Sequence, residues 1–398
     1  MYDFDRIIPR RGSCAVKWDA RPPFETDMDQ VIPLWVADMD FPAAPCILDA
    51  LRRRVEHGVF GYTHVPESYY EAVIRWFGRR HGWTVRRDWI LYTTGVVPAL
   101  SAVIKALTVP GDKVILQSPV YNCFFSSIRN NGCEIVDSPL LFNGRTYHFD
   151  YEGLERCCAD PKAKVLLLCN PHNPAGRVWT REELARVGEI ARRNNVAVIS
   201  DEIHCEIVMP GRHYTPFALA AGDSGCVTLC SPSKSFNIAG LQTANIITES
   251  ADWRNRIDRA ININEICDVN PFGPVALEAA YSEEGAVWLD ELNAYIAGNY
   301  EYLKERLSGW TVCDLEGTYL AWVDCRHLGL PSEKIEEELL REEKVWVNAG
   351  TMYGTEGFIR INLACPRSML AEGVDRLVAG LHRLSTPAKR KDLAKRYE

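Results

Sequence analysis

Short apolar runs that end in polar residues recur along the chain. Three of them, at 165–170, 196–200 and 226–230, have the sequences VLLLCN, VAVIS and CVTLC. Runs of this length bounded by turn-forming residues predict strands that are buried on both faces. Helical patterns alternate with such runs from about Ile47 to Tyr281, so we expect an α/β fold built on a mostly parallel sheet.

A longer helical pattern follows the last of these strands. It runs from Ala286 to Leu307 and leads into a shorter α/β segment at the end of the chain. The 398 residues are enough to bury two cores. We therefore expect a large domain at 47–285, a small domain at 286–398, and an N-terminal arm, 1–46, that joins the small domain.

Each predicted strand runs into a polar segment that carries candidate chemistry. Because open α/β sheets build their sites at the carboxyl ends of strands, these segments should lie close together. Asp201, at the start of DEIH, could pair with a protonated pyridine nitrogen, and Asn173, within PHNPAG, could donate to a phenolic oxygen. The plainer alternatives are a helix cap for Asp201 and a proline-rich connector around Asn173.

Lys234 follows the apolar run at 226–230, an unusual place for a residue type that is mostly exposed. In a partly desolvated site the ammonium form is disfavoured, so the pKa falls and the neutral amine can form a Schiff base. Ser231, Ser233 and Ser235 surround it, and their hydroxyls could hold phosphate oxygens. The alternative is an ordinary loop lysine among serines that cap a helix.

These segments, with others in the same order, resemble the fold type I pyridoxal-phosphate enzymes of aminotransferase class I and II over nearly the whole chain. The matching segments are TTGVVPAL at 93–100, SPVY at 118–121, NPHNPAG at 170–176, SDEIH at 200–204, SPSKSFNIAGLQ at 231–242 and FIRINLACPR at 358–367. More narrowly, PLWVADMDFP at 33–42, DEIH and SKSFNIAGL are similar to the carbon–sulfur β-lyase branch, the cystathionine β-lyase-like enzymes. The resemblance implies a large domain with a mostly parallel seven-stranded sheet, a smaller α/β domain, and pyridoxal 5'-phosphate as cofactor.

The resemblance also implies a role for each matching residue. Lys234 would hold the cofactor covalently, Asp201 would pair with its ring nitrogen, and Asn173 would bond its phenolic oxygen beside the substrate. Tyr121 would stack on the ring next to the substrate and act with Lys234 and Asp201 in catalysis. Taken alone, Tyr121 would be a tyrosine in an ordinary helical turn.

The phosphate of the cofactor would be bound from two sides. Val96 and Val97, at the start of a helix, would offer backbone N–H groups, and Ser231 and Ser233 their hydroxyls. Tyr62, in the segment FGYTH, is similar to the residue that reaches the phosphate of the neighbouring subunit in this family. The resemblance therefore implies a homodimer with shared sites.

Arg360 lies in an alternating strand-like segment, 358–363, whose other side chains are mostly apolar. A guanidinium in such a segment requires an anion, and its planar fork fits a carboxylate through two parallel hydrogen bonds. We expect Arg360 to bind the α-carboxylate of a small amino-acid substrate. A structural salt bridge is the alternative.

The chain departs from the family pattern at three places. Gln242 stands where many aminotransferases have an arginine that helps to neutralise the phosphate, so the phosphate site should depend on backbone donors and hydroxyls. His204 replaces a common tyrosine and is expected near the cofactor, although a packed, hydrogen-bonded histidine is the alternative. The segment 348–350 reads Asn-Ala-Gly where lyase relatives tend to have proline before glycine.

The reaction implied by the resemblance is α,β-elimination from an amino acid with sulfur on its β-carbon, such as cystathionine. The products would be a thiol, pyruvate and ammonia, with a place in amino-acid metabolism and methionine biosynthesis. An aminotransferase would share the first step, in which Lys234 takes the α-proton. A regulatory protein that binds a partner is the alternative from another class.

Composition excludes several partners. The net charge of −8 argues against nucleic acid or an anionic membrane. No apolar run approaches the length needed to cross a bilayer, and the first residues, MYDFDRIIPR, show no signal peptide. The 14 cysteines include no C-x-x-C pair, and some, such as Cys169 and Cys230, lie in apolar strands. We therefore expect no metal site and a cytoplasmic, reducing environment.

Overall fold

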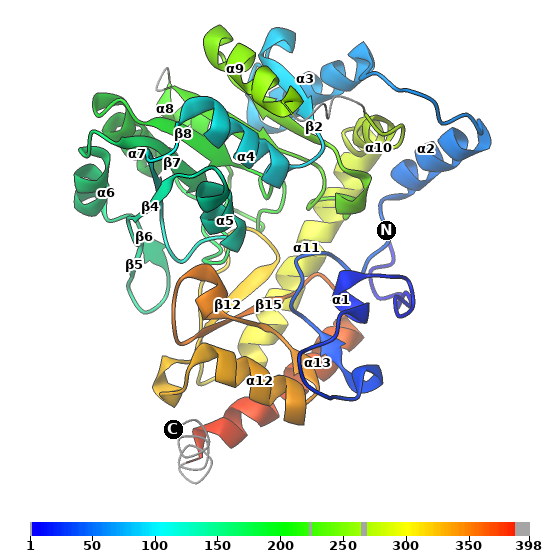
Figure 1. The fold of residues 1–398 in the computed structure, drawn as a ribbon. Coiled ribbons are helices and arrows are strands. Elements are labelled where there is room, and N and C mark those ends of the chain that lie inside the picture. The colour runs from blue at the N-terminus through cyan, green and yellow to red at the C-terminus, as the bar shows by residue number, and fades with distance from the viewer. Residues whose placement is uncertain (1, 223–224, 264–268, 387–398) are drawn as a thin grey trace.

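A seven-stranded sheet forms the centre of the computed structural model, which describes residues 2–222, 225–263 and 269–386 (Figure 1). Its order is β2 (Ile90–Thr93), β10 (Ala244–Ile247), β9 (Cys226–Cys230), β8 (Ala197–Asp201), β7 (Ala163–Cys169), β3 (Lys113–Leu116) and β4 (Glu134–Asp137). Strand β10 is antiparallel to both neighbours, and the pairs from β9 to β4 are parallel. The predicted α/β class and mostly parallel seven-stranded sheet are confirmed, with the three apolar runs as β7, β8 and β9.

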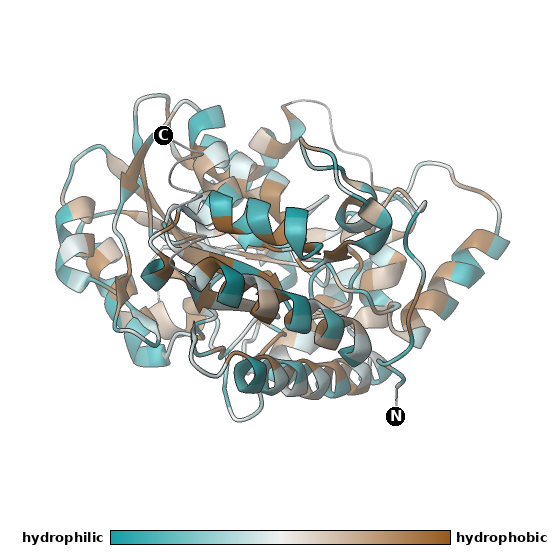
Figure 2. Cartoon of the chain, turned by 90° about the horizontal axis from the view of Figure 1, so that it is seen from below, coloured by the Kyte–Doolittle hydropathy of each residue, from teal (hydrophilic) through white to brown (hydrophobic). Residues whose placement is uncertain are grey.

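Helices cover both faces of this sheet, which explains why its central strands are apolar throughout. Val165 and Leu167 of β7 belong to the core on one face, and Leu166 and Leu168 to the core on the other. The first face carries α4 (Val96–Leu107), α5 (Asn122–Asn130) and α9 (Ala251–Asn262), and the second carries α6 (Tyr151–Cys158), α7 (Arg181–Arg193) and α8 (Phe217–Ala221). Many helices accordingly have both an apolar and a polar side (Figure 2).

A smaller antiparallel sheet lies beyond the first, in the lower part of Figure 1. Its order is β11 (Thr311–Val312), β12 (Leu320–Asp324), β15 (Phe358–Asn362) and β14 (Asn348–Ala349). Helices α12 (Ser332–Glu342) and α13 (Arg367–Ser385) lie beside this sheet. Helix α11 (Glu283–Arg306), predicted at 286–307, runs from α10 (Gly273–Ala280) down to this region.

The N-terminal segment reaches the same region of the molecule (Figure 1). It contains α1 (Val16–Asp19), the 3₁₀ turn Met28–Gln30 and β1 (Ile32–Pro33), which pairs in parallel with β13 (Val345–Trp346). The residues after β1 are bonded to the end of β15, since Asn362 N–H donates to the Leu34 carbonyl at 2.8 Å. Segments from the two ends of the chain therefore lie side by side near the candidate site.

The remaining elements are short or peripheral. They are α2 (Pro45–Glu56), α3 (Glu67–His81), the hairpin of β5 (Leu141–Phe142) and β6 (Tyr147–His148), and the 3₁₀ turns Arg87–Trp89, Ala239–Leu241, Arg326–Leu328 and Gly350–Tyr353. Helix α2 packs against α10 at one side of the molecule (Figure 1). Within the described ranges, none of the helices is both long and apolar enough to cross a membrane.

Candidate active site

A cavity of about 480 Å³ lies at the carboxyl ends of β7, β8 and β9, where the polar segments follow the strands. Nine of the predicted site residues line it: Val96, Val97, Tyr121, Asn173, Asp201, His204, Ser233, Lys234 and Arg360. Of the other predicted residues, Ser231 lies just behind Ser233, while Tyr62 is outside the cavity and 96% exposed. The cavity therefore gathers side chains that are nearly 265 residues apart, from Val96 to Arg360.

Lys234 faces this cavity from the turn that follows β9. Its Nζ donates to the carbonyl of Ala37 at 2.7 Å. Burial lowers the pKa of Lys234 to about 8, and the nearby positive charge of Arg360 acts in the same direction. An amine with this pKa is partly neutral near physiological pH, which is the form that attacks carbonyl carbon and accepts protons.

Asp201 is the last residue of β8 and is 4% exposed. Its carboxylate accepts the backbone N–H of Ile203 at 3.2 Å, and burial raises the pKa of Asp201 to about 7. Among the described residues, no cation lies within salt-bridge distance of it. A buried carboxylate without a cation is costly, so this side chain fits a positively charged ligand group such as a protonated ring nitrogen.

Arg360 and Asn173 meet across the cavity from the two sheets. Nη1 of Arg360 donates to Oδ1 of Asn173 at 3.1 Å, and its Nη2 donates to the carbonyl of Trp35 at 2.9 Å. The buried Nε of Arg360 has no protein partner in the described part of the chain. The guanidinium thus has no carboxylate of its own here, which removes the structural salt bridge and leaves capacity for an anionic substrate group.

The N-terminus of α4 forms the side of the cavity where a phosphate is expected. The helix begins at Val96 after Gly95, and no side chain caps it, so its first N–H groups are free for an anion. Ser233 lines the cavity, whereas the hydroxyl of Ser231 donates to the Thr243 carbonyl at 2.6 Å. Within this site, the backbone of α4 and the Ser233 hydroxyl are the best placed anion donors.

The remaining phosphate-side residues do not contribute a charge. Ser235 lies outside the lining of the cavity, and its hydroxyl donates to the Pro232 carbonyl at 3.4 Å. Gln242 adopts a positive φ of 54°, and its carbonyl accepts the hydroxyl of Tyr92 at 2.9 Å. Neither residue supplies a cation, and the reliance of the phosphate site on backbone donors stays a prediction.

His204 and Tyr121 both line the cavity as neutral groups. Burial lowers the pKa of His204 well below its ordinary value, and the charges of Lys234 and Arg360 act in the same direction. Its buried Nδ1 has no partner among the described residues. Burial raises the pKa of Tyr121, so its phenol stays protonated at physiological pH. His204 therefore has a ring nitrogen in the wall of the cavity that is unpaired within the described structure.

Several lining residues were not expected from the sequence, among them Trp35, Tyr353 and the side chain of Asn348. Asn348 Nδ2 donates to the Trp35 carbonyl at 2.8 Å and to the Tyr353 hydroxyl at 3.0 Å, which leaves its buried Oδ1 without a partner in the described structure. The adjacent Gly350 is required sterically, because a Cβ there would lie 2.7 Å from the Thr355 carbonyl oxygen. The Asn-Ala-Gly segment therefore contributes Asn348 to the cavity wall, and its effect on substrate preference stays a prediction.

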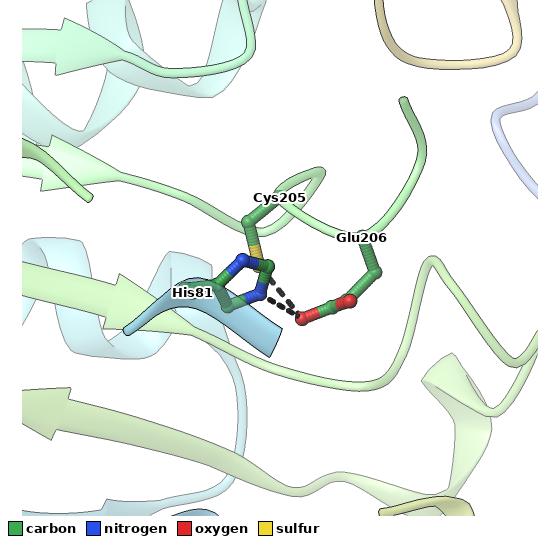
Figure 3. Close-up of side chains that lie close together, drawn as sticks. All are labelled: His81, Cys205 and Glu206. Atoms are coloured by element: carbon green, nitrogen blue, oxygen red, sulfur yellow. Dashed lines mark hydrogen bonds and ion pairs between the residues drawn. The ribbon is translucent and has the colours of Figure 1, made fainter. Parts of the chain in front are cut away.

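A second group of polar side chains follows directly after His204 (Figure 3). The ligand atoms of His81, Cys205 and Glu206 lie within 4.8 Å of one another, the arrangement that a metal ion requires. However, Glu206 already accepts Nε1 of Trp76 at 2.7 Å and Nε of Arg80 at 3.0 Å, besides its 2.6 Å contact with His81. Because an arginine occupies the carboxylate, we interpret the group as a buried ion-pair network that anchors the turn carrying His204.

The described cysteines are all free. The residues of the cavity fit pyridoxal 5'-phosphate group by group. An amine, an unpaired carboxylate and an uncapped helix N-terminus face the same space as Asn173, whose Oδ1 is taken by Arg360 so that its Nδ2 is the free donor. These are partners for an aldehyde, a ring nitrogen, a phosphate and a phenolic oxygen, respectively.

Comparison with known proteins agrees with this geometry. Residues 29–377 match the family model of aminotransferase class I and II. Cystathionine β-lyase PatB of Bacillus subtilis is 40% identical over 95% of this chain and 100% of the relative. Cystalysin from Treponema denticola, whose crystal structure contains a pyridoxal 5'-phosphate cofactor, is 36% identical over 96% of this chain and 100% of that chain, with a TM-score of 0.89. A pyridoxal-phosphate-bound putative aminotransferase from Clostridium difficile is 39% identical over 96% and 100%, with a TM-score of 0.90. The chain belongs to the aminotransferase class I and II family and has its fold type I architecture.

Proposed function

We propose that the protein is a pyridoxal-phosphate-dependent carbon–sulfur β-lyase that cleaves cystathionine or a related S-substituted cysteine. The observation that carries the proposal is the cavity shared by Lys234, Asp201 and Arg360, in a chain that is 40% identical over its length to a cystathionine β-lyase. The reaction consumes the amino acid and one water and yields a thiol, pyruvate and ammonia.

The cofactor is assigned to the wall formed by α4, Asp201 and Lys234. The N–H groups of Val96 and Val97 and the hydroxyl of Ser233 bind the phosphate, while Ser231, whose own hydroxyl proton goes to the Thr243 carbonyl, lies behind Ser233. When bound, pyridoxal phosphate draws electrons from the α-carbon of the amino acid and so lets that carbon lose a proton. Asp201 keeps a proton on the pyridine nitrogen, which sustains this electron withdrawal.

The remaining residues orient the cofactor and substrate. Asn173 donates to the phenolic oxygen through its Nδ2, beside His204, and Tyr121 lies against the ring face. Arg360 holds the α-carboxylate with its guanidinium fork. With the carboxylate fixed, the bond from the α-carbon to its proton can be directed toward Lys234, which is the geometric condition for fast proton transfer.

Lys234 is the base that takes the α-proton. Its lowered pKa, about 8, provides a substantial neutral fraction near pH 7 to 8. The electron pair left on the α-carbon side then forms a double bond to the β-carbon, and the carbon–sulfur bond breaks with its electron pair going to sulfur. Lys234, now protonated, faces the same cavity and can give its proton to the departing sulfur, which leaves as a thiol.

Replacing Lys234 with alanine tests the proposal. The variant should retain its fold, lose the visible absorbance of the covalently held cofactor, and lose turnover of cystathionine. Undiminished turnover would contradict the assignment. A second candidate is an aminotransferase, favoured by the name of the similar Clostridium difficile structure; its requirement for a keto acid separates the two activities.

We further propose a cytoplasmic homodimer with domains at 47–285 and 286–398 and with 1–46 joining the small one. Support for the dimer comes from the projecting segment between α2 and α3, where Val59, Phe60 and Tyr62 are 63%, 53% and 96% exposed. Such a group of exposed apolar side chains is typical of an interface. Tyr62 then reaches the phosphate of the neighbouring site, and the enzyme serves amino-acid metabolism such as methionine biosynthesis.

A further inference from the structure

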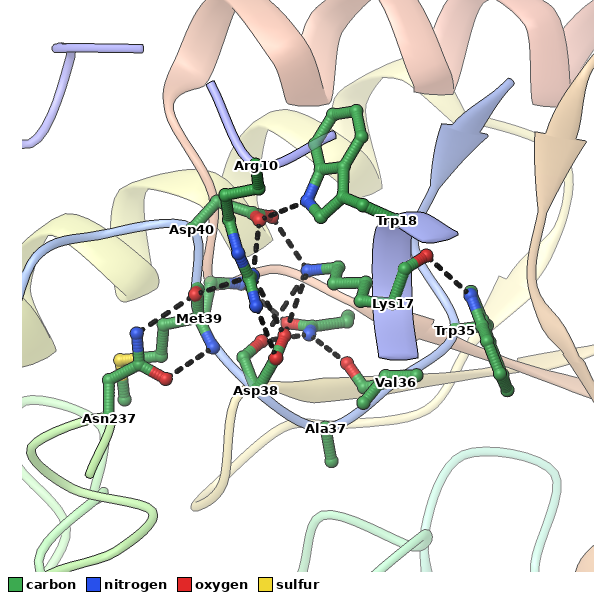
Figure 4. A network of polar contacts seen from close by, with 12 residues as sticks. Arg10, Lys17, Trp18, Trp35, Val36, Ala37, Asp38, Met39, Asp40 and Asn237 are labelled. Carbon is green, nitrogen blue, oxygen red and sulfur yellow. Dashed lines mark hydrogen bonds and ion pairs between the residues drawn. The ribbon is translucent and has the colours of Figure 1, made fainter. Parts of the chain in front are cut away.

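The residues after β1 run as a bent segment along one wall of the cavity, and we call residues 35–38 the strap (Figure 4). The strap is held through its carbonyl groups. That of Trp35 accepts Nη2 of Arg360 at 2.9 Å, and that of Ala37 accepts Nζ of Lys234 at 2.7 Å. Two backbone oxygens of one short segment therefore contact both the base and the carboxylate-binding group.

Other side chains donate to carbonyl oxygens of the strap as well. The hydroxyl of Tyr319 donates to the Ala37 carbonyl at 2.9 Å, and Nδ2 of Asn362 donates to the Asp38 carbonyl at 2.6 Å. Tyr319 is fully buried, so its hydroxyl has little freedom to move. The Ala37 oxygen thus has two donors and a defined direction.

A buried ion-pair network holds the end of the strap (Figure 4). Lys17 is 0% exposed, and its Nζ lies 2.7 Å from Oδ2 of Asp40 and 3.4 Å from the Asp38 carbonyl. Arg10 donates to the carboxylates of Asp38 and Asp40 at 2.7 Å each, and Nε1 of Trp18 donates to Asp40 at 2.8 Å. Buried ion pairs add little net free energy of folding, because the cost of desolvating both charges offsets their attraction. We therefore consider that this network serves to fix the position of the strap.

The hydrogen bond to the Ala37 carbonyl restricts the orientation of the Lys234 amine. A neutral amine carries two N–H bonds and one lone pair around its nitrogen. When one N–H points to the Ala37 oxygen, the lone pair points away from that oxygen. The contact thereby restricts which directions the basic electron pair of Lys234 can take, as preorganised groups do in active sites.

We propose that the strap is a positioning element for the base: the Ala37 carbonyl receives the Lys234 amine whenever the amine is not bonded to the cofactor, and the Lys17–Asp40 pair keeps that carbonyl in place. Neither Lys17 nor Asp40 lines the cavity, so both act through the strap. The inference rests on the proposed function only for the transfer of the α-proton, which a lyase and an aminotransferase share.

The variants that test this are Lys17→Met and the double variant Lys17→Met with Asp40→Asn. The double variant is neutral at both positions, so it avoids leaving a single buried charge and remains informative if Lys17→Met does not fold. Lys113 and Asp160 form a matched control, since they make a lysine–aspartate pair at 2.6 Å outside the cavity lining. The control is Lys113→Met with Asp160→Asn.

Two readouts are measured on each cofactor-loaded protein. The first is the exchange of backbone amides in peptides covering residues 33–41, by mass spectrometry in D₂O. The second is the exchange of the α-proton of saturating L-alanine for deuterium, by NMR; alanine has no leaving group on its β-carbon, so it reports proton transfer without elimination. A displaced base should slow α-proton exchange by about tenfold to a hundredfold.

We expect faster amide exchange in the strap and slower α-proton exchange in the double variant, with the control unchanged in both. A folded double variant with wild-type values of either quantity would overturn the inference. So would a wild-type protein that exchanges no α-proton, because Lys234 would then not act as the base. A wild-type protein that exchanges the proton but releases no pyruvate from cystathionine would contradict the lyase proposal while leaving the strap proposal intact.

Discussion

Asn173 and Arg360 are 187 residues apart in the chain and are joined by a hydrogen bond of 3.1 Å between Oδ1 and Nη1. Asn173 follows β7 in the large sheet, and Arg360 is the central residue of β15 in the small sheet. The bond occupies the acceptor of Asn173, so its Nδ2 is left to donate into the cavity. One contact therefore orients both the residue assigned to the phenolic oxygen and the residue assigned to the substrate carboxylate.

Asn173→Ala should therefore weaken substrate binding as well as cofactor binding. Hydrogen bonds to charged groups contribute about 1.5–3 kcal/mol, so we expect the KM for the amino acid to rise at least tenfold. Steady-state kinetics at saturating pyridoxal phosphate measure this effect separately from cofactor loss. An unchanged KM would mean that Arg360 does not need Asn173 for its orientation.

The lowered pKa of Lys234 predicts a pH dependence. Burial and the charge of Arg360 bring this pKa to about 8, so the fraction of neutral amine rises as the pH increases from about 6.5 to 9. The rate at which pyridoxal phosphate adds to cofactor-free protein, followed by its absorbance, should rise over the same range with a midpoint near 8. A midpoint near the ordinary lysine value of 10.5 would show that the site does not perturb the amine.

Two substitutions of Arg360 should separate its charge from its shape. Arg360→Lys retains a positive charge but loses the planar fork, whereas Arg360→Met loses both. Both should lower kcat/KM for amino acids about a hundredfold or more, since each loses a bidentate carboxylate contact of roughly 3 kcal/mol. Removing a nearby like charge favours the ammonium form, so only Arg360→Met should raise the pKa of Lys234. The same midpoint in both variants would argue against this electrostatic coupling.

If the network around Glu206 is held by ion pairs and not by a metal ion, substituting Glu206 should lower the free energy of unfolding. Burial raises the pKa of Glu206, but the charges of His81 and Arg80 and the hydrogen bonds from His81 and Trp76 outweigh burial, and its pKa is lowered overall. Glu206→Ala leaves the donors of His81 and Trp76 without their acceptor and leaves Arg80 with Asp290 alone, so it should cost about 3 kcal/mol in urea unfolding. Because the folded pKa is lowered, the contribution of Glu206 is present above its ordinary value of 4.5 and is lost as the pH falls through the folded pKa.

Removal of metal ions tests the other interpretation of the same cluster. Dialysis against a chelator should leave the unfolding midpoint of the native protein unchanged, and added Zn²⁺ should not raise it. A chelator-dependent fall in the midpoint that Glu206→Ala abolishes would show that His81, Cys205 and Glu206 do bind a metal.

The proposed dimer can be tested by mixing two inactive variants. Tyr62→Ala and Lys234→Ala each impair every site of their own homodimer. A mixed dimer contains one site with both substitutions and one site with native Tyr62 and Lys234, so refolding the two together should restore activity. Restoration up to about a quarter of the native specific activity is expected for random pairing of equal amounts, in which half of the dimers are mixed. No restoration, although mixed dimers are present, would place Tyr62 outside the neighbouring site.

The large sheet and the main polar residues of the cavity could be predicted because each depends on a short stretch of sequence, an apolar run followed by polar residues. An apolar run such as that of β7 can be buried on both faces only in a covered sheet, and its polar end must lie at the sheet edge. Helix α11 begins at Glu283 rather than at 286, because the hydroxyl of Ser282 caps it by accepting Gly285 N–H at 3.1 Å. The apolar pattern alone did not include this cap.

The strap could not be predicted in the same way. Its function in the structure depends on the backbone oxygens of Trp35 and Ala37, and a carbonyl group has no sequence signature. Their partners, Lys234 and Arg360, come from distant elements that meet only in the folded chain. PLWVADMDFP was recognised as a family segment, but its contacts follow from tertiary packing.

The central claim is that the site eliminates a thiol from a sulfur amino acid. Purified protein loaded with pyridoxal phosphate is given cystathionine without any keto acid, and pyruvate and free thiol are followed together. The account predicts equal amounts of pyruvate and thiol, with neither formed by Lys234→Ala. No product under these conditions, with turnover only when a keto acid is added to an amino-acid donor, would contradict the account and identify an aminotransferase.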